Sequence, residues 1–376
     1  MINPVNAPCV DDPKKIIYSL QILRGIAAVL VLVRHTSKFA WGQDSELAFP
    51  AGQAGVDIFF VISGVVIYLT GRNLSWDVFA RRRLARIVPL YWAILLVAVA
   101  ASFLPRLLGA SAIPLNGGSE SWNVISSFLF IPSFDENHDI YPLIVAGWTL
   151  NFEMYFYAIC TLVLMFAPRR LFLMLVSVAV MGCIALGAPL FWATDRAVDF
   201  PPMILLLPIA GEFVSGMWIA HIWNGGGRTS RGITLSVLVL AIIWLALAPT
   251  AQPFTAWRPL AWGVPAVAIV WALLSLEESI RFDRWRAALL VGDASYALYL
   301  THPVVLLLAT ALMRALHVDL DFGLKLALAL AGCLIVGVAV HKLVEKPLVR
   351  AANKLLGLSR ARSHHVVQAV EASATA

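Results

Sequence analysis

The sequence predicts an all-α integral membrane protein, a bundle of about ten transmembrane helices with both termini in the cytoplasm. Hydrophobic residues make up 60% of the 376 residues, charged residues only 13%, and the mean hydropathy is +0.82. Because soluble proteins are about 25% charged, this composition excludes soluble, disordered, fibrous and disulfide-stapled proteins. The apolar residues fall into long runs without the alternation of polar and apolar residues that is typical of β-barrels.

The apolar runs define the predicted helices. A helix needs about 20 residues to cross about 30 Å of hydrocarbon, and each run fits within variation in tilt and in its ends. The runs cover residues 16–35, 55–71, 87–105, 143–166, 171–191, 203–222, 233–249, 259–276, 288–313 and 323–344. We therefore predict a cytoplasmic tail over 1–15, a membrane domain over 16–347 and a disordered cytoplasmic tail over 348–376.

The basic residues predict the orientation. With the N-terminus inside, most of the 28 Lys and Arg residues fall in inner segments, as the positive-inside rule requires. The net charge of +6 is therefore interpreted as a signal of topology and of anionic partners rather than of nucleic acid. The four cysteines form no CxxC motif, so neither a metal site nor a disulfide framework is predicted.

Arg24 and His35 are the first candidate functional residues, because ionisable groups at bilayer depth usually face a cavity. The eleven positions between them amount to about 1100°, close to a whole number of turns, and about 16 Å along a helix. Both side chains are thus expected on one face of the first helix. The alternative is a snorkelling arginine with an interfacial histidine.

Two acidic residues are candidates to support His35. Asp57 opens the second predicted helix after a short loop, so it is expected close to His35, where a carboxylate would fix the imidazole tautomer; the alternative is a simple N-cap. Glu153 lies several residues into the fourth helix, one turn before Tyr157. It needs a partner or a cavity, and the alternative there is a structural hydrogen bond.

Basic residues at the inner end of the third helix are candidates for binding phosphate groups. Arg83 and Arg86 are spaced to share one helix face, and Arg82 adds charge beside them. Such a cluster favours a clamp for phosphates at the cytoplasmic mouth. Ordinary positive-inside anchoring is the alternative.

Ser295, Tyr299 and His302 form a polar stripe on the ninth predicted helix. Their spacing places them on one face, with His302 near the middle of the bilayer. We expect these three residues to take part in binding a cofactor or co-substrate. A buried histidine satisfied by its neighbours is the alternative.

Several motifs in order resemble acyltransferase family 3, the integral membrane acyltransferases of bacterial envelope polysaccharides, O-antigen, Nod factors and some small molecules. The motifs are LRGIAA with the Arg24-to-His35 spacing, GVDIFFVISG at 55–64, FARRRLARIVPLYW at 79–92, WTLNFEMYFY at 148–157, SYALYLTHP at 295–303 and EKP at 345–347. The resemblance implies ten or so transmembrane helices and an acyl-CoA donor, usually acetyl-CoA, reached from the cytoplasm. It also implies that His35 is the essential histidine and Arg24 its partner arginine. Arg83 and Arg86 match the family's paired arginines, and Glu153 matches its glutamate.

Residues and resemblance together predict an O-acyltransferase of the bacterial inner membrane. It would move an acetyl or other short acyl group from acyl-CoA, a co-substrate rather than a bound cofactor, to a hydroxyl of an envelope glycan or glycolipid. His35 would be the general base, since an unperturbed imidazole has a pKa of about 6.5; a covalent acyl-histidine is the alternative. A transporter or flippase is the competing function, although it would typically show paired halves with interrupted helices. No metal is predicted.

Overall fold

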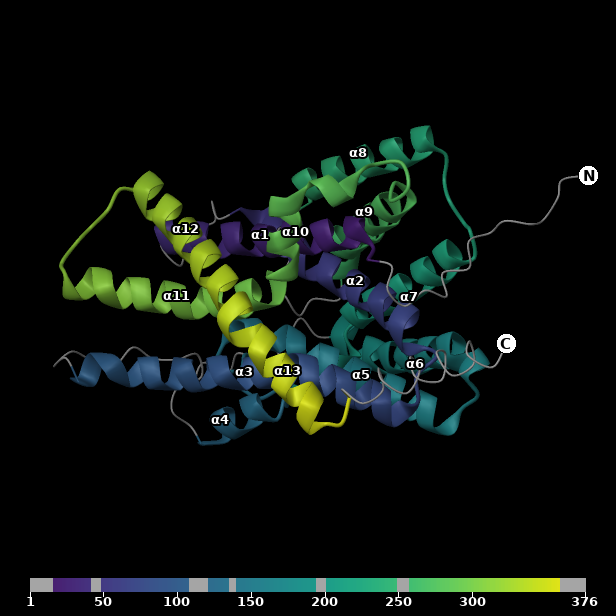
Figure 1. Ribbon diagram of the computed structural model, residues 1–376, viewed down its shortest axis with the longest axis horizontal. Coiled ribbons are helices and arrows are strands. Elements are labelled where there is room, and N and C mark those ends of the chain that lie inside the picture. The colour runs from purple at the N-terminus through teal and green to yellow at the C-terminus, as the bar shows by residue number, and fades with distance from the viewer. Residues whose placement is uncertain are drawn as a thin grey trace, which may run out of the picture.

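A computed structural model describes residues 16–41, 49–107, 121–134, 140–193, 201–248 and 257–358. Within these ranges the chain forms helices and no strand, as its composition predicted (Figure 1). The longer helices are α1 (Tyr18–Trp41), α2 (Ala54–Gly71), α3 (Trp76–Leu107), α5 (Trp148–Phe166), α6 (Phe172–Ala193), α8 (Arg231–Leu247), α11 (Ser295–Ala315) and α12 (Phe322–Val340). The shorter ones are α4 (Ser121–Phe128), α7 (Gly211–Asn224), α9 (Val264–Ser275), α10 (Arg286–Asp293) and α13 (Lys346–Leu355).

Seven helical segments of the described chain are long and apolar enough to cross a membrane. Two further apolar helices, Arg231–Leu247 and Pro259–Ser275, are shorter. Two of the predicted runs are not single helices. The 203–222 run begins as 3₁₀ turns and becomes α-helical only in α7, and the 288–313 run divides at Ala294 between α10 and α11. Interrupted helices therefore occur in this fold, whereas the sequence predicted one continuous helix for each run.

Proline accounts for the first interruption. Pro201 and Pro202 open the 3₁₀ turn Pro201–Leu206, and Pro208 opens the turn Pro208–Ala210 that precedes α7. Proline has no backbone N–H and clashes with the preceding turn, so α-helical hydrogen bonding cannot run through these positions.

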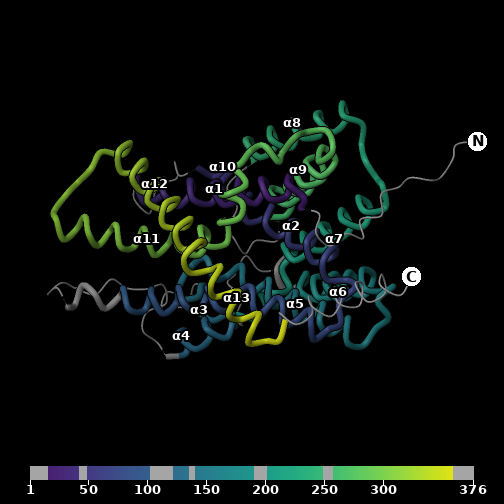
Figure 2. The backbone as a smooth tube through the Cα atoms, viewed as in Figure 1, coloured from purple at the N-terminus to yellow at the C-terminus, as the bar shows by residue number. Residues whose placement is uncertain are grey.

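Close backbone packing accompanies the second interruption. A Cβ atom at Gly292, near the end of α10, would lie 2.0 Å from the carbonyl oxygen of Gln21 on α1. Only glycine allows that approach. The separation of α10 from α11 lets both helices pack against α1 at different angles, as the tube in Figure 2 shows.

The C-terminal tail begins with ordered structure. Helix α13 covers Lys346–Leu355, so the prediction of a disordered tail from residue 348 is wrong for this segment. Arg81 of α3 donates to the carbonyl oxygen of Leu356 at 3.0 Å, which fastens the end of α13 to α3. Residues 359–376 of the predicted tail and all of 1–15 lie outside the described residues.

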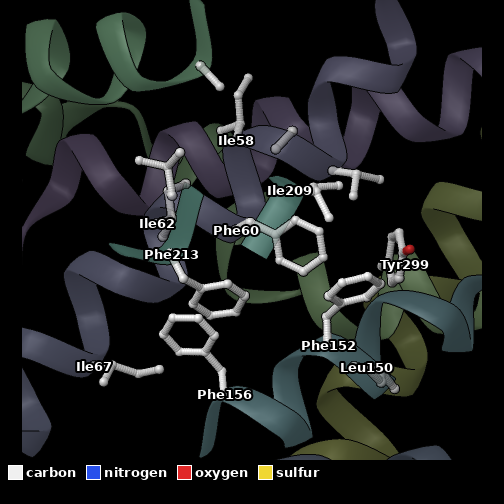
Figure 3. Packing of buried hydrophobic residues seen from close by; sticks show 14 of the residues in the cluster. Ile58, Phe60, Ile62, Ile67, Leu150, Phe152, Phe156, Ile209, Phe213 and Tyr299 are labelled. Carbon is white, nitrogen blue, oxygen red and sulfur yellow. The ribbon is translucent and has the colours of Figure 1, made fainter. Parts of the chain in front are cut away.

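Helices α2 and α7 cross at two glycines. A Cβ atom at Gly64 would lie 2.0 Å from the carbonyl oxygen of Phe213, and one at Gly216 would lie 2.0 Å from that of Val61. Small residues allow two membrane helices to approach this closely. The crossing brings Phe213 of α7 under Phe60 of α2, with ring centroids 5.2 Å apart, and against Phe156 of α5 at 3.8 Å (Figure 3).

We expect Gly64→Ala to lower the free energy of unfolding by about 1–3 kcal/mol, because the added methyl group overpacks the crossing. Thermal unfolding of the purified protein in detergent would measure the change. Gly182→Ala in α6 is the matched control, since a Cβ atom there meets nothing within 4 Å. Equal melting temperatures for the two variants would contradict the packing assigned to Gly64.

Candidate active site

A cavity of about 150 Å³ lies among α1, α2, α3, α5 and α11. Three arginines from two helices line it: Arg24 from α1 and both Arg83 and Arg86 from α3. We call it the arginine cavity. Three other candidate residues, Glu153, Ser295 and Tyr299, also line it, together with Tyr157, which lies one turn after Glu153. Arg83 and Arg86 line the same cavity, and so do Ser295 and Tyr299. This lining agrees with the prediction that the members of each pair share one helix face.

The three arginines differ in how they are held. The Nη2 atom of Arg83 donates to the hydroxyl of Thr70 at 2.6 Å, and the guanidinium lies over the rings of Phe79 and Tyr157. Arg24 and Arg86 have no side-chain hydrogen-bond partner among the described residues. Two guanidinium groups facing one cavity without a partner create an attractive field for an anion.

Glu153 is the only acid in the described lining of the arginine cavity. The hydroxyl of Tyr157 donates a hydrogen bond to its carboxylate. With three arginines and one glutamate, the lining carries a net positive charge. Glu153 thus lies with the arginines, whereas the sequence made it a candidate to support His35.

Arg82 does not join the other two arginines. Its side chain is exposed and lies outside the lining of the arginine cavity. Successive residues of a helix point in directions about 100° apart, so a helix that turns Arg83 and Arg86 inward turns Arg82 away. Only its charge and its position beside Arg83 associate Arg82 with the pair in the sequence.

His35 is paired with His302. The Nε2 atom of His302 lies 3.2 Å from Nδ1 of His35, and the ring centroids are 4.8 Å apart. His302 is buried and His35 is half-buried. The sequence predicted both residues as functional but placed His302 with the donor-binding stripe, and did not predict this contact.

The hydrogen bonds around the pair assign its protons. Nδ1 of His35 lies 3.0 Å from the carbonyl oxygen of Val31, and Nδ1 of His302 lies 3.3 Å from that of Leu298. Because a carbonyl oxygen only accepts, both Nδ1 atoms carry hydrogen. The single Nδ1–H of His35 is then shared between the carbonyl oxygen of Val31 and Nε2 of His302, and the free lone pair of the His35 ring is on its own Nε2.

Tyr299 connects the arginine cavity with the histidine pair. Its ring lines the cavity and lies 5.9 Å from the ring of His302, centroid to centroid. Its hydroxyl accepts a hydrogen bond from Thr149 at 3.0 Å, which fixes the ring. The chain thus places the arginines, Tyr299 and the two histidines in sequence along the inside of the bundle.

Asp57 has a different partner from the one predicted. Its two carboxylate oxygens accept from Nε and Nη2 of Arg258, at 3.1 and 2.6 Å. Both side chains are fully buried. A guanidinium offers two parallel donors that match a carboxylate. The carboxylate of Asp57, which was expected to orient His35, is therefore bound to Arg258 instead. That prediction for Asp57 is corrected: His302 is the neighbour of the His35 ring.

Three residues around the site were not predicted. Tyr296 lines the arginine cavity and donates to the carbonyl oxygen of Ile87 at 2.8 Å. Thr149 holds Tyr299, and Arg258 holds Asp57 from 201 positions away. Tyr296 and Thr149 belong to motifs that were recognised, whereas Arg258 lies in none of them.

Comparison with known proteins adds independent evidence. Residues 17–342 match the family described as Acyltransferase domain. The exopolysaccharide production protein ExoZ of Rhizobium meliloti (strain 1021) is 30% identical over 312 residues, which cover 80% of this chain and 91% of that protein. The acyltransferase MdmB of Streptomyces mycarofaciens is 27% identical over 382 residues, covering 91% of this chain and 93% of that protein.

A third relative is longer than this chain. The peptidoglycan O-acetyltransferase OatA of Listeria monocytogenes serovar 1/2a (strain ATCC BAA-679 / EGD-e) is 24% identical over 89% of this chain and 56% of its own length. No solved structure matches the chain significantly. Because the family match spans most of the chain, and several described helices are long and apolar enough to cross a membrane, the protein is a multi-pass membrane acyltransferase that belongs to acyltransferase family 3.

Proposed function

We propose that the protein transfers an acetyl or another short acyl group from cytoplasmic acyl-CoA to a hydroxyl group of an envelope glycan or glycolipid. Two relatives, one named for exopolysaccharide production and one for O-acetylation of peptidoglycan, support a glycan acceptor. The main structural support is the line of residues that runs from the arginine cavity through Tyr299 to the histidine pair. Such a line offers anion-binding groups at one end and a base at the other.

The donor is proposed to bind through its phosphates. The phosphate groups of CoA are charged and therefore cannot enter the hydrocarbon of the membrane. Arg83 and Arg86 offer positive charge for them at the wall of the arginine cavity. The cavity is far smaller than a nucleotide, so the head group would stay at its mouth while the uncharged arm enters. Arg24 is then in position to stabilise negative charge that develops on the thioester oxygen. Acyl-CoA is a co-substrate in this scheme, and no permanently bound cofactor is required.

The proposed topology has about ten crossings of the bacterial inner membrane, with both termini in the cytoplasm. The seven long helical segments supply most of the crossings. The shorter helices α7, α8 and α9, together with the turns that precede α7 and α9, would supply the others. This arrangement keeps most of the Lys and Arg residues on the cytoplasmic side.

His35 is proposed as the general base. Its Nε2 takes the proton of the acceptor hydroxyl, and the resulting oxygen attacks the carbonyl carbon of the thioester. The carbon–sulfur bond then breaks, and the CoA thiolate leaves with the proton returned by His35. His302 orients the base, since its Nε2 accepts the Nδ1–H of His35. A covalent acyl-His35 intermediate would use the same nitrogen and give ping-pong kinetics.

Membrane vesicles of both orientations, supplied with labelled acetyl-CoA, would test the function. We expect label to reach envelope glycan only when acetyl-CoA has access to the cytoplasmic face. Movement of unmodified glycan without labelling would identify a carrier instead, and labelling from the opposite face would refute the proposed topology. Mass spectrometry of envelope glycans from cells with and without the gene would identify the acceptor.

We expect Arg83→Ala and Arg86→Ala to weaken acetyl-CoA binding about tenfold to a hundredfold each, since a charged hydrogen bond contributes about 1.5–3 kcal/mol. Titration of the purified protein with acetyl-CoA would measure the dissociation constant. Arg82→Ala is the matched control, because the exposed side chain of Arg82 lies outside the cavity lining. An unchanged dissociation constant in both cavity variants would exclude the phosphate clamp.

A further inference from the structure

A second, larger cavity of about 630 Å³ lies where the ends of α1 and α11 meet the start of α12. It falls within the range of about 300–1,000 Å³ that is typical of ligand sites. Neither the proposed donor site nor the proposed base uses it. Its polar lining consists of Lys38, Thr310, Arg314, His317, Asp319 and Lys325, and we call it the lysine pocket.

The lysine pocket is positively charged. Lys38, Arg314 and Lys325 are its cations, and Asp319 is the only acid in the described lining. Asp319 pairs with Lys325 at 3.5 Å, and its side chain is 97% exposed. Lys38 and Arg314 have no ion-pair partner among the described residues. Two cations therefore remain available to an anionic ligand.

The lysine pocket lies beyond the histidine pair, on the side away from the arginine cavity. Lys38 follows His35 by three residues, which places it on nearly the same face of α1 and about 5 Å further along the axis. Arg24, in the arginine cavity, precedes Lys38 by fourteen residues, or about 21 Å. The connection between α11 and α12, which carries Asp319, projects at the left of the view in Figure 1.

The charge of this pocket is unusual for its position. In the proposed topology it faces the non-cytoplasmic side, where Lys and Arg residues are disfavoured. Most of the basic residues of the chain lie on the other side, yet three of them meet in one pocket here. Positioning within the membrane does not account for such a cluster, whereas binding of an anion does.

We propose that the lysine pocket binds the phosphate or diphosphate group of the acceptor, so that a hydroxyl of the attached sugar is presented to His35. The inference rests on the proposed function and names a chemical class for its acceptor: a sugar linked through phosphate. The short distance along α1 from Lys38 to His35 suits an acylated hydroxyl on the sugar next to the phosphate. Arg314 and the two lysines supply the charge that a diphosphate requires.

Equilibrium binding to the full-length protein in phosphatidylcholine nanodiscs would test this site without any acyl transfer. The probe is radiolabelled decyl diphosphate–glucose, and decyl glucoside is its neutral counterpart. We expect the diphosphate probe to bind more tightly, and the Lys38→Gln/Arg314→Gln double variant to bind it at least about tenfold more weakly than the unaltered protein. Acetyl-CoA binding should be the same in both proteins.

The matched control is Arg169→Gln/Arg170→Gln, which removes two exposed arginines from the turn before α6 and should leave probe binding unchanged. Equal affinity of the lysine-pocket double variant and the unaltered protein would overturn the inference, as would equal binding of probe and decyl glucoside. Displacement by phosphatidylglycerol in the nanodisc would assign the pocket to bulk lipid. Equally tight binding of inorganic diphosphate would reduce it to a general anion site. If the probe binds as expected but acetyl-CoA does not, the donor assignment fails and the lysine pocket stands.

Discussion

Replacing His35 with alanine is expected to lower acyl transfer by at least about 10²–10⁴-fold, the usual contribution of a general base. The reason is the assigned proton arrangement: Nδ1 of His35 is committed to Val31 and His302, and Nε2 carries the free lone pair. Removing the ring removes that base. The measurement is transfer of label from acetyl-CoA to glycan in vesicles, with the amount of inserted protein held equal.

Two companion measurements make the His35 result specific. Acetyl-CoA binding should be largely intact in His35→Ala, because the arginine cavity does not include His35. His35→Gln keeps a polar side chain without a basic nitrogen and should be equally inactive. Acyl transfer near the normal rate in either variant would remove His35 from the mechanism. Label that stays on the unaltered protein but not on His35→Gln would favour the covalent route.

Asp57→Ala is expected to destabilise the protein by about 3–5 kcal/mol, because it removes the carboxylate that accepts from two donors of the buried Arg258 guanidinium. The Arg258 and Asp57 side chains are 2% and 0% exposed. The pair joins α2 to the segment that leads into α9, so its loss should loosen both. Thermal or denaturant unfolding in detergent would measure the change, and the kcat of the remaining folded fraction would separate stability from catalysis.

An exposed ion pair provides the control for Asp57. Asp283→Ala breaks the contact with Arg281, whose side chain is 72% exposed, and should leave the melting temperature nearly unchanged, because solvent screens an exposed ion pair. Substituting both members of the buried pair, as in Asp57→Leu/Arg258→Met, should be less harmful than Asp57→Ala alone. A stable Asp57→Ala protein with no acyl transfer would point back to a direct role of Asp57 in the chemistry.

Local features of the site could be predicted from the sequence because they depend on helix periodicity. The spacing of Arg83 and Arg86 predicts one face, and both residues line the same cavity. The same holds for Ser295 and Tyr299.

Contacts between distant segments could not be predicted in this way. His35 meets His302 across 267 positions, and Asp57 meets Arg258 across 201. Such pairings depend on how helices are arranged around one another, and a single sequence contains no periodic signal for that. The division at Ala294 is similar, since it is accompanied by packing of Gly292 on α1 rather than by a proline.

The buried rings of Tyr299 and His302 have a consequence for the cell as well as for the enzyme. They lie between the arginine cavity and the lysine pocket, and these two recesses share no lining residue. A protein that meets one substrate at each face of an energised membrane risks conducting protons and dissipating the gradient that drives ATP synthesis. In the proposed topology these two rings separate the recesses, so acyl transfer between the two faces would not require a continuous water-filled path.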